Sequence, residues 1–249
     1  MPEPFELSVA EAALQIRRRE LSPLALVESL LGRIDSFEPN LKAWVYLDRE
    51  AVLSEAREME RRSEAGQVAG ALHGVPIGLK DIYYTAGIPT TACSKLYADF
   101  IPEYDATTVT LLKRAGALML GKAVTTEFAC MDPSPTINPW NAAHTPGGSS
   151  SGSAVAVAAR MCPAALGSQT VGSVLRPASY NGIVGFKPTF GRVSRYGVIP
   201  VSWSLDHVGW MTRTVEDAAL LLQVMAGPDA SDPVSSRLPV PDFTAGLES

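Results

Sequence analysis

Three helices are predicted in the first seventy residues. Ser8 and Glu11 have the spacing of a capping box at the start of the first helix. Pro23 lies in the first turn of the second helix, and Gly66 ends the third. The predicted ranges are 8–20, 22–34 and 49–65. The pattern therefore predicts a helical N-terminal layer over residues 1–70.

The pattern changes at Leu72, where short apolar runs alternate with glycine and proline, as in strands and turns. Further on, apolar runs of strand type are followed by segments with helical spacing. The predicted elements are a helix at 106–115, a strand at 117–124, a helix from about 152, a strand at 163–167 and a helix at 214–226. This alternation predicts an α/β core over residues 71–233. Residues 234–249 are rich in proline, serine and aspartate, which predicts a loop or disordered tail.

Charge, apolar segments and cysteine spacing limit the partners and the cellular location that we expect for this protein. The net charge of −5 offers no general attraction to nucleic acid or to an anionic membrane surface. No apolar stretch reaches the roughly 18–20 residues that a membrane span needs, and the N-terminus has no signal-peptide pattern. Three widely spaced cysteines suit a reducing compartment. We therefore expect a cytoplasmic protein with no direct nucleic-acid or membrane partner.

Two short motifs suggest other chemistry. Gly116 and Gly121-Lys122 have P-loop spacing, but Ala123 stands where a hydroxyl would bind magnesium, and the residues between are apolar. The segment from Gly148 to Gly152 matches G-x-S-x-G, although no hydrophobic strand precedes it. The same glycines and serines are also typical of a flexible linker. The histidines and cysteines show no metal-ligand spacing.

The stretch from residue 146 to 177 contains the strongest signal of chemistry. It begins with a glycine- and serine-rich turn, continues through an apolar helix and a short strand, and ends near a second serine, Ser173. Lys80 directly follows an apolar strand. Burial lowers the pKa of a lysine and leaves a neutral amine that can accept a proton. Two serines and a buried lysine suggest acyl transfer.

These segments together resemble the amidase signature family. Four of them agree in order: HGVPIGLKD (73–81), PGGSSSGSA (146–154), GSQTVGSVLRPAS (167–179) and GIVGFKPTFGRVSRYG (182–197). The resemblance covers the chain to about residue 233 and implies an α/β fold with a mixed sheet flanked by helices. It also implies a Ser–Ser–Lys triad with Lys80 as the base, Ser149 as the serine after a cis peptide bond and Ser173 as the nucleophile.

The resemblance implies further roles around this triad. The backbone N–H groups of Thr170, Val171 and Gly172 would form the oxyanion hole, and Ser151 and Ser168 would orient the relay. Arg176 is expected to brace the turn. The reaction implied is hydrolysis of a small-molecule amide without a metal or cofactor.

The sequence departs from the family pattern at Val171, where a glycine is usual. A β-branched residue tolerates a positive φ poorly, so a left-handed backbone there would strain the oxyanion hole. The chain is also about half the usual family length, which suggests an N-terminal fragment or a degenerate remnant.

Three functions therefore stay open. The first is a stand-alone amidase, and the second is the A subunit of a glutamine-dependent tRNA amidotransferase. The third is an inactive remnant. The serine- and glycine-rich pattern expected of the A subunit is missing before the serine turn, which favours the stand-alone amidase. The sequence leaves open a homodimer or amidotransferase partner subunits.

Overall fold

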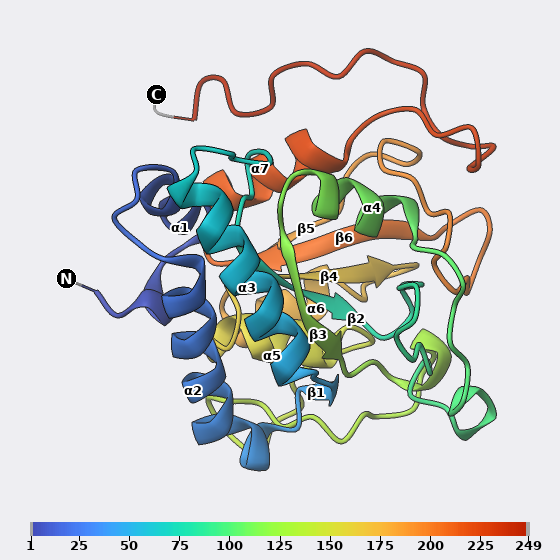
Figure 1. Cartoon of the computed structure of the whole chain (residues 1–249). Helices are drawn as coiled ribbons and strands as arrows, with labels where there is room; N and C mark the ends of the chain where they lie inside the picture. The colour runs from blue at the N-terminus through green and yellow to red at the C-terminus, as the bar shows by residue number, and fades with distance from the viewer. Residues whose placement is uncertain (1, 248–249) are drawn as a thin grey trace.

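A computed structural model describes residues 2–247. At its centre lies a six-stranded sheet of order β1-β3-β2-β4-β6-β5 (Figure 1). Strand β2 is parallel to β3 and β4, and the remaining neighbours pair antiparallel. The strands are β1 (Trp44–Tyr46), β2 (Pro76–Lys80), β3 (Leu118–Ala123), β4 (Ala164–Gln169), β5 (Val184–Phe186) and β6 (His207–Thr212). The predicted mixed α/β sheet is confirmed.

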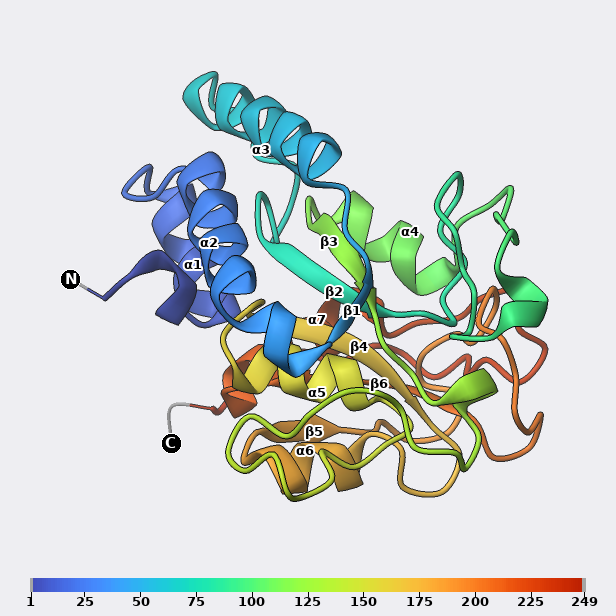
Figure 2. The same cartoon turned by 90° about the horizontal axis from the view of Figure 1, so that it is seen from below.

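Helices cover both faces of this sheet (Figures 1 and 2). The α-helices are α1 (Val9–Arg17), α2 (Pro23–Leu41), α3 (Arg49–Glu64), α4 (Thr107–Arg114), α5 (Ser151–Ala158), α6 (Leu175–Asn181) and α7 (Val215–Met225). Three short 3-10 turns lie at Pro4–Glu6, Lys95–Tyr97 and Glu127–Ala129. Within residues 2–247, no helix is long and apolar enough to cross a membrane.

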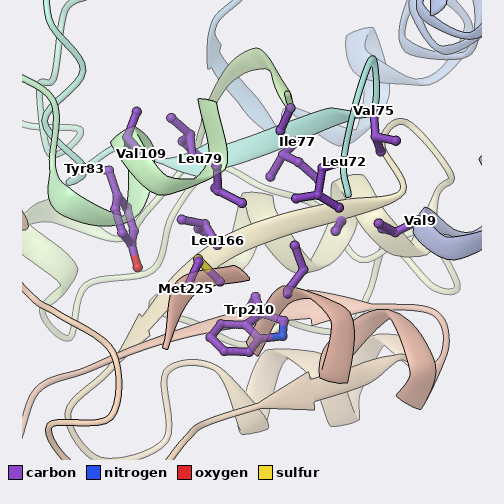
Figure 3. Packing of buried hydrophobic residues seen from close by; sticks show 14 of the residues in the cluster. Val9, Leu72, Val75, Ile77, Leu79, Tyr83, Val109, Leu166, Trp210 and Met225 are labelled. Carbon is purple, nitrogen blue, oxygen red and sulfur yellow. The ribbon is translucent and has the colours of Figure 1, made fainter. Parts of the chain in front are cut away.

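Successive side chains of each strand point to opposite faces of the sheet, so the hydrophobic core consists of two clusters, one on each face. Leu166 and Trp210 face one cluster with α1, α4 and α7 (Figure 3), whereas Ala165 and Met211 face the other with α5 and α6. Each central strand therefore contributes to both clusters. The sheet is therefore buried on both sides, and polar groups at its strand ends are removed from water.

Local sequence signals determine several helix boundaries. The Ser8 side chain accepts a hydrogen bond from the Glu11 N–H, and Thr214 does the same for Asp217 at the start of α7. Gly116 follows α4 with a φ of +89°, a conformation that favours glycine. The predicted capping box at Ser8 is confirmed, because it depends on residues within one turn.

The prediction of an all-helical first seventy residues is wrong in one element. The three-residue strand β1 pairs antiparallel with β3, and α2 continues to Leu41. Three residues are too few to show a strand periodicity in sequence, and a partner about eighty residues away provides the pairing. The N-terminal layer thus belongs to the same sheet as the core. The boundaries at residues 70 and 233 stay predictions.

The tail after α7 contains no helix or strand among its described residues, and its last two residues lie outside them. It is nevertheless tied to the core. The carboxylate of Asp229 accepts from the hydroxyls of Thr107 and Ser194, both at 2.5 Å. Asp232 accepts from the Arg195 N–H at 2.8 Å. These hydrogen bonds hold the tail beside the loop that precedes β6.

Candidate active site

Lys80 is the last residue of β2, and its side chain is completely buried. Its Nζ donates to Ser149 Oγ at 2.7 Å and to Ser168 Oγ at 2.9 Å. Burial lowers the pKa of Lys80 to about 7, and the Asp206 carboxylate and the Cys93 sulfur oppose this shift. A substantial share of Lys80 is therefore the neutral amine near neutral pH.

A neutral amine has two N–H donors and one lone pair. With Ser168 accepting one N–H, the lone pair of Lys80 is free to accept the proton of Ser149. The observed pair of hydroxyl contacts thus suits a lysine that acts as a base.

Ser149 lies in the glycine-rich loop that leads into α5. The peptide bond between Gly148 and Ser149 is cis, at the position where the family resemblance expects one. The Thr126 N–H donates to the Ser149 carbonyl at 3.0 Å. Arg176 donates through Nε and Nη2 to the Gly148 carbonyl, at 3.1 and 2.7 Å. Arg176 therefore braces the loop that carries Ser149.

Ser173 lies in the turn between β4 and α6 and is partly exposed. The Ser150 N–H donates to its carbonyl at 3.2 Å, which joins the two serine turns. Among residues 2–247, no hydrogen bond joins the Ser173 and Ser149 hydroxyls. The structure thus connects Lys80 to Ser149 through side chains, and it connects Ser173 to this loop through the backbone.

The turn before Ser173 shows no left-handed strain. Neither Val171 nor Gly172 has a positive φ, and the Val171 side chain is 87% exposed. A Cβ added at Gly172 would meet only the Arg176 side chain, at an ordinary 3.7 Å. The strain expected for a left-handed valine therefore does not arise, because the φ of Val171 is not positive.

Gln169, the last residue of β4, stabilises this turn through its side chain. Its side-chain carbonyl accepts from the N–H groups of Val174 and Leu175, both at 2.9 Å. The N–H groups of Gly172 and Ser173 donate to no protein acceptor within the described chain. Free N–H groups at such a turn can hold an anionic oxygen. The residue type of Gln169 does not indicate this role, which depends on its position beneath the turn in the folded chain.

The contacts of Ser151 differ from those expected. Its hydroxyl lies 2.6 Å from the hydroxyl of Ser134, and it begins α5 as a buried residue. No contact of Ser151 with Lys80 occurs in the part of the chain described. Ser151 is the first residue of α5, and its hydroxyl pairs with Ser134 instead.

The P-loop interpretation is excluded by the fold. Gly121 and Lys122 lie inside β3, where their backbone pairs with neighbouring strands. The ammonium of Lys122 is buried, donates to Thr90 Oγ1 at 2.8 Å and lies 3.9 Å from Asp81. Among the described residues, no three metal-binding side chains come together.

A cavity of about 230 Å³ opens beside the cis peptide bond. Its lining includes Thr126, Met131, Ser134, Gly148, Arg176 and Tyr180. The cavity borders the serine loop at Gly147 and Gly148, but Lys80, Ser149 and Ser173 are not among its lining residues. An α/β sheet that buries a lysine against a serine hydroxyl defines a candidate serine–lysine hydrolase.

Comparison with known proteins identifies the family. The sequence model described as Amidase matches residues 25–249, so the chain belongs to the amidase family. Curated relatives include the glutamyl-tRNA(Gln) amidotransferase A subunits of Geobacter metallireducens and Myxococcus xanthus, each 47% identical over 98% of this chain. The chain covers 52% and 51% of their lengths, respectively.

Solved structures agree with this assignment. The native peptide amidase of Stenotrophomonas maltophilia superposes with a TM-score of 0.90 at 40% identity, over 98% of this chain and 53% of that one. The glutamyl-tRNA(Gln) amidotransferase A subunit of Thermotoga maritima gives 0.82 at 35% identity, over 96% and 51%. The chain thus spans about half the length of the proteins that it matches.

Proposed function

We propose that this chain carries the catalytic serines and lysine of an amidase that cleaves a linear carboxamide. The observation that carries the proposal is the fully buried Lys80, whose Nζ lies 2.7 Å from Ser149 Oγ. Its pKa of about 7 suits a base that works near neutral pH. Membership in the amidase family supports the same chemistry.

In the proposed reaction, Ser173 Oγ attacks the amide carbonyl carbon. The Ser173 proton passes to Ser149 as the Ser149 proton passes to neutral Lys80. Collapse of the tetrahedral intermediate breaks the C–N bond, and the proton returns through the relay to the leaving nitrogen. Water then attacks the acyl-enzyme ester by the same route, which yields a carboxylic acid and regenerates Ser173.

The oxyanion would bind to backbone N–H groups of the turn at Thr170, Val171 and Gly172, together with Ser173. Removing one such donor typically costs roughly 3 kcal/mol of transition-state stabilisation. Ser168 would hold Lys80 in place through the 2.9 Å hydrogen bond. The proposed mechanism uses these protein groups alone, since they supply each proton transfer that the reaction needs.

A second candidate is the glutaminase reaction of an amidotransferase A subunit. The names of the curated relatives favour it, since relatives at 45–47% identity are named as A subunits. In that case the amide is glutamine, and the chain works with partner subunits. For either reaction we propose a cytoplasmic location, because Cys93, Cys130 and Cys162 are all free thiols.

A fluorophosphonate probe tests the proposed nucleophile. Intact-mass analysis should show one added group on the wild-type chain, no addition on Ser173→Ala and slow addition on Lys80→Ala. Circular dichroism of each variant provides the folding control. A folded wild-type chain that stays unlabelled would favour the inactive remnant over both enzymes.

Substrate assays then distinguish the two reactions. A stand-alone amidase should release ammonia from peptide amides without a partner. An A subunit should release it from glutamine, with turnover that rises when the partner subunits, tRNA and ATP are added.

A further inference from the structure

Thr170 and Asp206 form a cross-strand pair at the edge of the candidate active site. In the antiparallel ladder of β4 and β6, Gln169 lies opposite His207. The next position in this register places Thr170 opposite Asp206, and Thr170 Oγ1 donates to Asp206 Oδ1 at 2.5 Å. Strands β4 and β6 lie side by side in the sheet (Figure 1). The pair thus joins the turn that carries Ser173 to the loop before β6.

Asp206 is itself held firmly. Its second carboxylate oxygen accepts from the N–H groups of Val201 and Ser202, at 2.7 and 2.8 Å. The Asp206 N–H donates to the Ser202 carbonyl at 3.0 Å, which closes a tight turn. Arg195 donates to the carbonyls of Trp203 and Asp206, at 2.7 and 3.3 Å. Asp206 therefore offers Thr170 an acceptor with little freedom to move.

The same carboxylate lies close to the buried lysine, because Asp206 and Ser168 line one small cavity and the Ser168 hydroxyl accepts from Lys80 at 2.9 Å. Asp206 raises the pKa of Lys80 against the larger lowering effect of burial. The other group with this effect on Lys80 is the Cys93 sulfur, which lies in the loop just before the 3-10 turn Lys95–Tyr97. Nearby on the sheet, Lys122 of β3 is paired with Asp81 at 3.9 Å. Ser149 and Ser168 contact Lys80 directly.

We propose that Asp206 is a positioning residue with two effects on the reaction: through Thr170 it fixes the turn that carries Ser173, and through its charge it acts on the Lys80 amine. This inference rests on the proposed function, because it concerns the rate of the same acylation step. Neither residue was given this role by the sequence, since the pairing appears only once β4 and β6 are in register.

Matched variants distinguish the effect of the Thr170–Asp206 hydrogen bond from the effect of the Asp206 charge. Thr170→Val keeps the shape of the side chain and the charge of Asp206 but removes the hydrogen bond. Thr170→Ser keeps the hydroxyl. Asp206→Asn removes the charge. With its oxygen toward Thr170, the amide NH2 faces the N–H groups of Val201 and Ser202, so the position of the acid limb is measured in this variant and its absolute rate is not compared. Thr244→Val serves as the control, because it removes a threonine–aspartate hydrogen bond of 2.6 Å in the exposed tail.

The measurement is the second-order rate constant of fluorophosphonate labelling at Ser173 from pH 5 to 9. The acid limb is the low-pH part of this profile, where the rate falls as Lys80 becomes protonated. We expect Thr170→Val to slow labelling about tenfold at every pH, because a hydrogen bond to a charged acceptor is lost. The pH of the acid limb should not change in this variant. Thr170→Ser should restore most of the rate, and Thr244→Val should match the wild type. Asp206→Asn should move the acid limb to lower pH, since a negative charge that raises the pKa of Lys80 is gone.

The outcomes distinguish this inference from the proposed function. If wild-type Ser173 is not labelled, the proposed function fails and this inference fails with it. If the wild type is labelled and folded Thr170→Val reacts at the wild-type rate, the inference alone is overturned. An unmoved acid limb in folded Asp206→Asn would overturn the electrostatic effect, and if Asp206→Asn does not fold, Thr170→Val still decides the positional one.

Discussion

Lys80 shows how the chemistry of one residue depends on complete burial. In water a lysine amine is protonated at neutral pH and cannot accept a proton. At the end of β2, removal from water disfavours the charge and lowers the pKa to about 7. Two hydroxyls remain as its hydrogen-bond partners.

This pKa predicts the pH dependence of acylation. Below about pH 7 Lys80 becomes protonated and loses its ability to accept a proton, so the rate should fall with falling pH. Above that pH the amine is neutral, and the rate should reach a plateau. A pH profile of kcat/KM, or of labelling at Ser173, measures the limb. A limb near the ordinary lysine pKa would contradict a role for buried Lys80 as the base.

Two neighbouring serines give a matched test of the relay. Ser149 contacts Lys80, whereas Ser151 contacts Ser134. We expect Ser149→Ala to slow acylation at least about a hundredfold, because a proton-transfer group is lost. Ser151→Ala should keep the wild-type rate and lose about 1 kcal/mol of folding free energy. Labelling kinetics and urea unfolding measure the two effects, and similar rate losses in both variants would argue against the relay.

At the scale of elements, α5 approaches the sheet closely at one glycine. The Gly152 N–H donates to the Val124 carbonyl at 2.9 Å, so helix and strand backbones nearly touch. A Cβ at this position would lie 2.2 Å from the Ala43 carbonyl oxygen. Glycine here permits the contact that places the serine loop over the end of β2.

Substitution of this glycine should therefore be costly. Gly152→Ala is expected to lower the free energy of unfolding by about 3 kcal/mol through overpacking. Gly32 in α2 is the control, since a Cβ there meets nothing within 4 Å. Gly32→Ala should stabilise the chain by up to about 1 kcal/mol, because alanine favours helix. Denaturant unfolding measures both, and equal stabilities would contradict the close approach.

At the scale of the whole molecule, one sheet joins the N-terminal layer to the rest. β1 pairs with β3, and residues of α2 and α3 share a hydrophobic cluster with α5. Strand β5 lies at the opposite edge of the sheet from β1. An edge strand has unpaired backbone groups that another strand can bind.

The shared sheet predicts a single unfolding transition. Far-ultraviolet circular dichroism follows the helices, and near-ultraviolet dichroism follows the packing of aromatic side chains such as Trp210, which is buried beneath α7. The two signals should change at the same urea concentration. Two separate transitions would instead support an independent helical layer at residues 1–70.

The sequence by itself determined the features that depend on near neighbours. Caps at Ser8 and Thr214, the glycine after α4 and the apolar run of β3 are local signals, and the structure has the predicted elements there. The family motifs also placed Lys80, Ser149 and Ser173 in one hypothesis, because the motifs occur along the sequence in the same order as in the family.

Tertiary structure decided what depends on distant contacts. Strand β1, the pairing of Thr170 with Asp206 and the capping of α6 by Gln169 require strand register or turn geometry that short sequence windows do not contain. The same holds for the basicity of Lys80. Its partners lie 69 and 88 residues away, and its pKa is lowered only because the folded sheet and its helices exclude water from all sides.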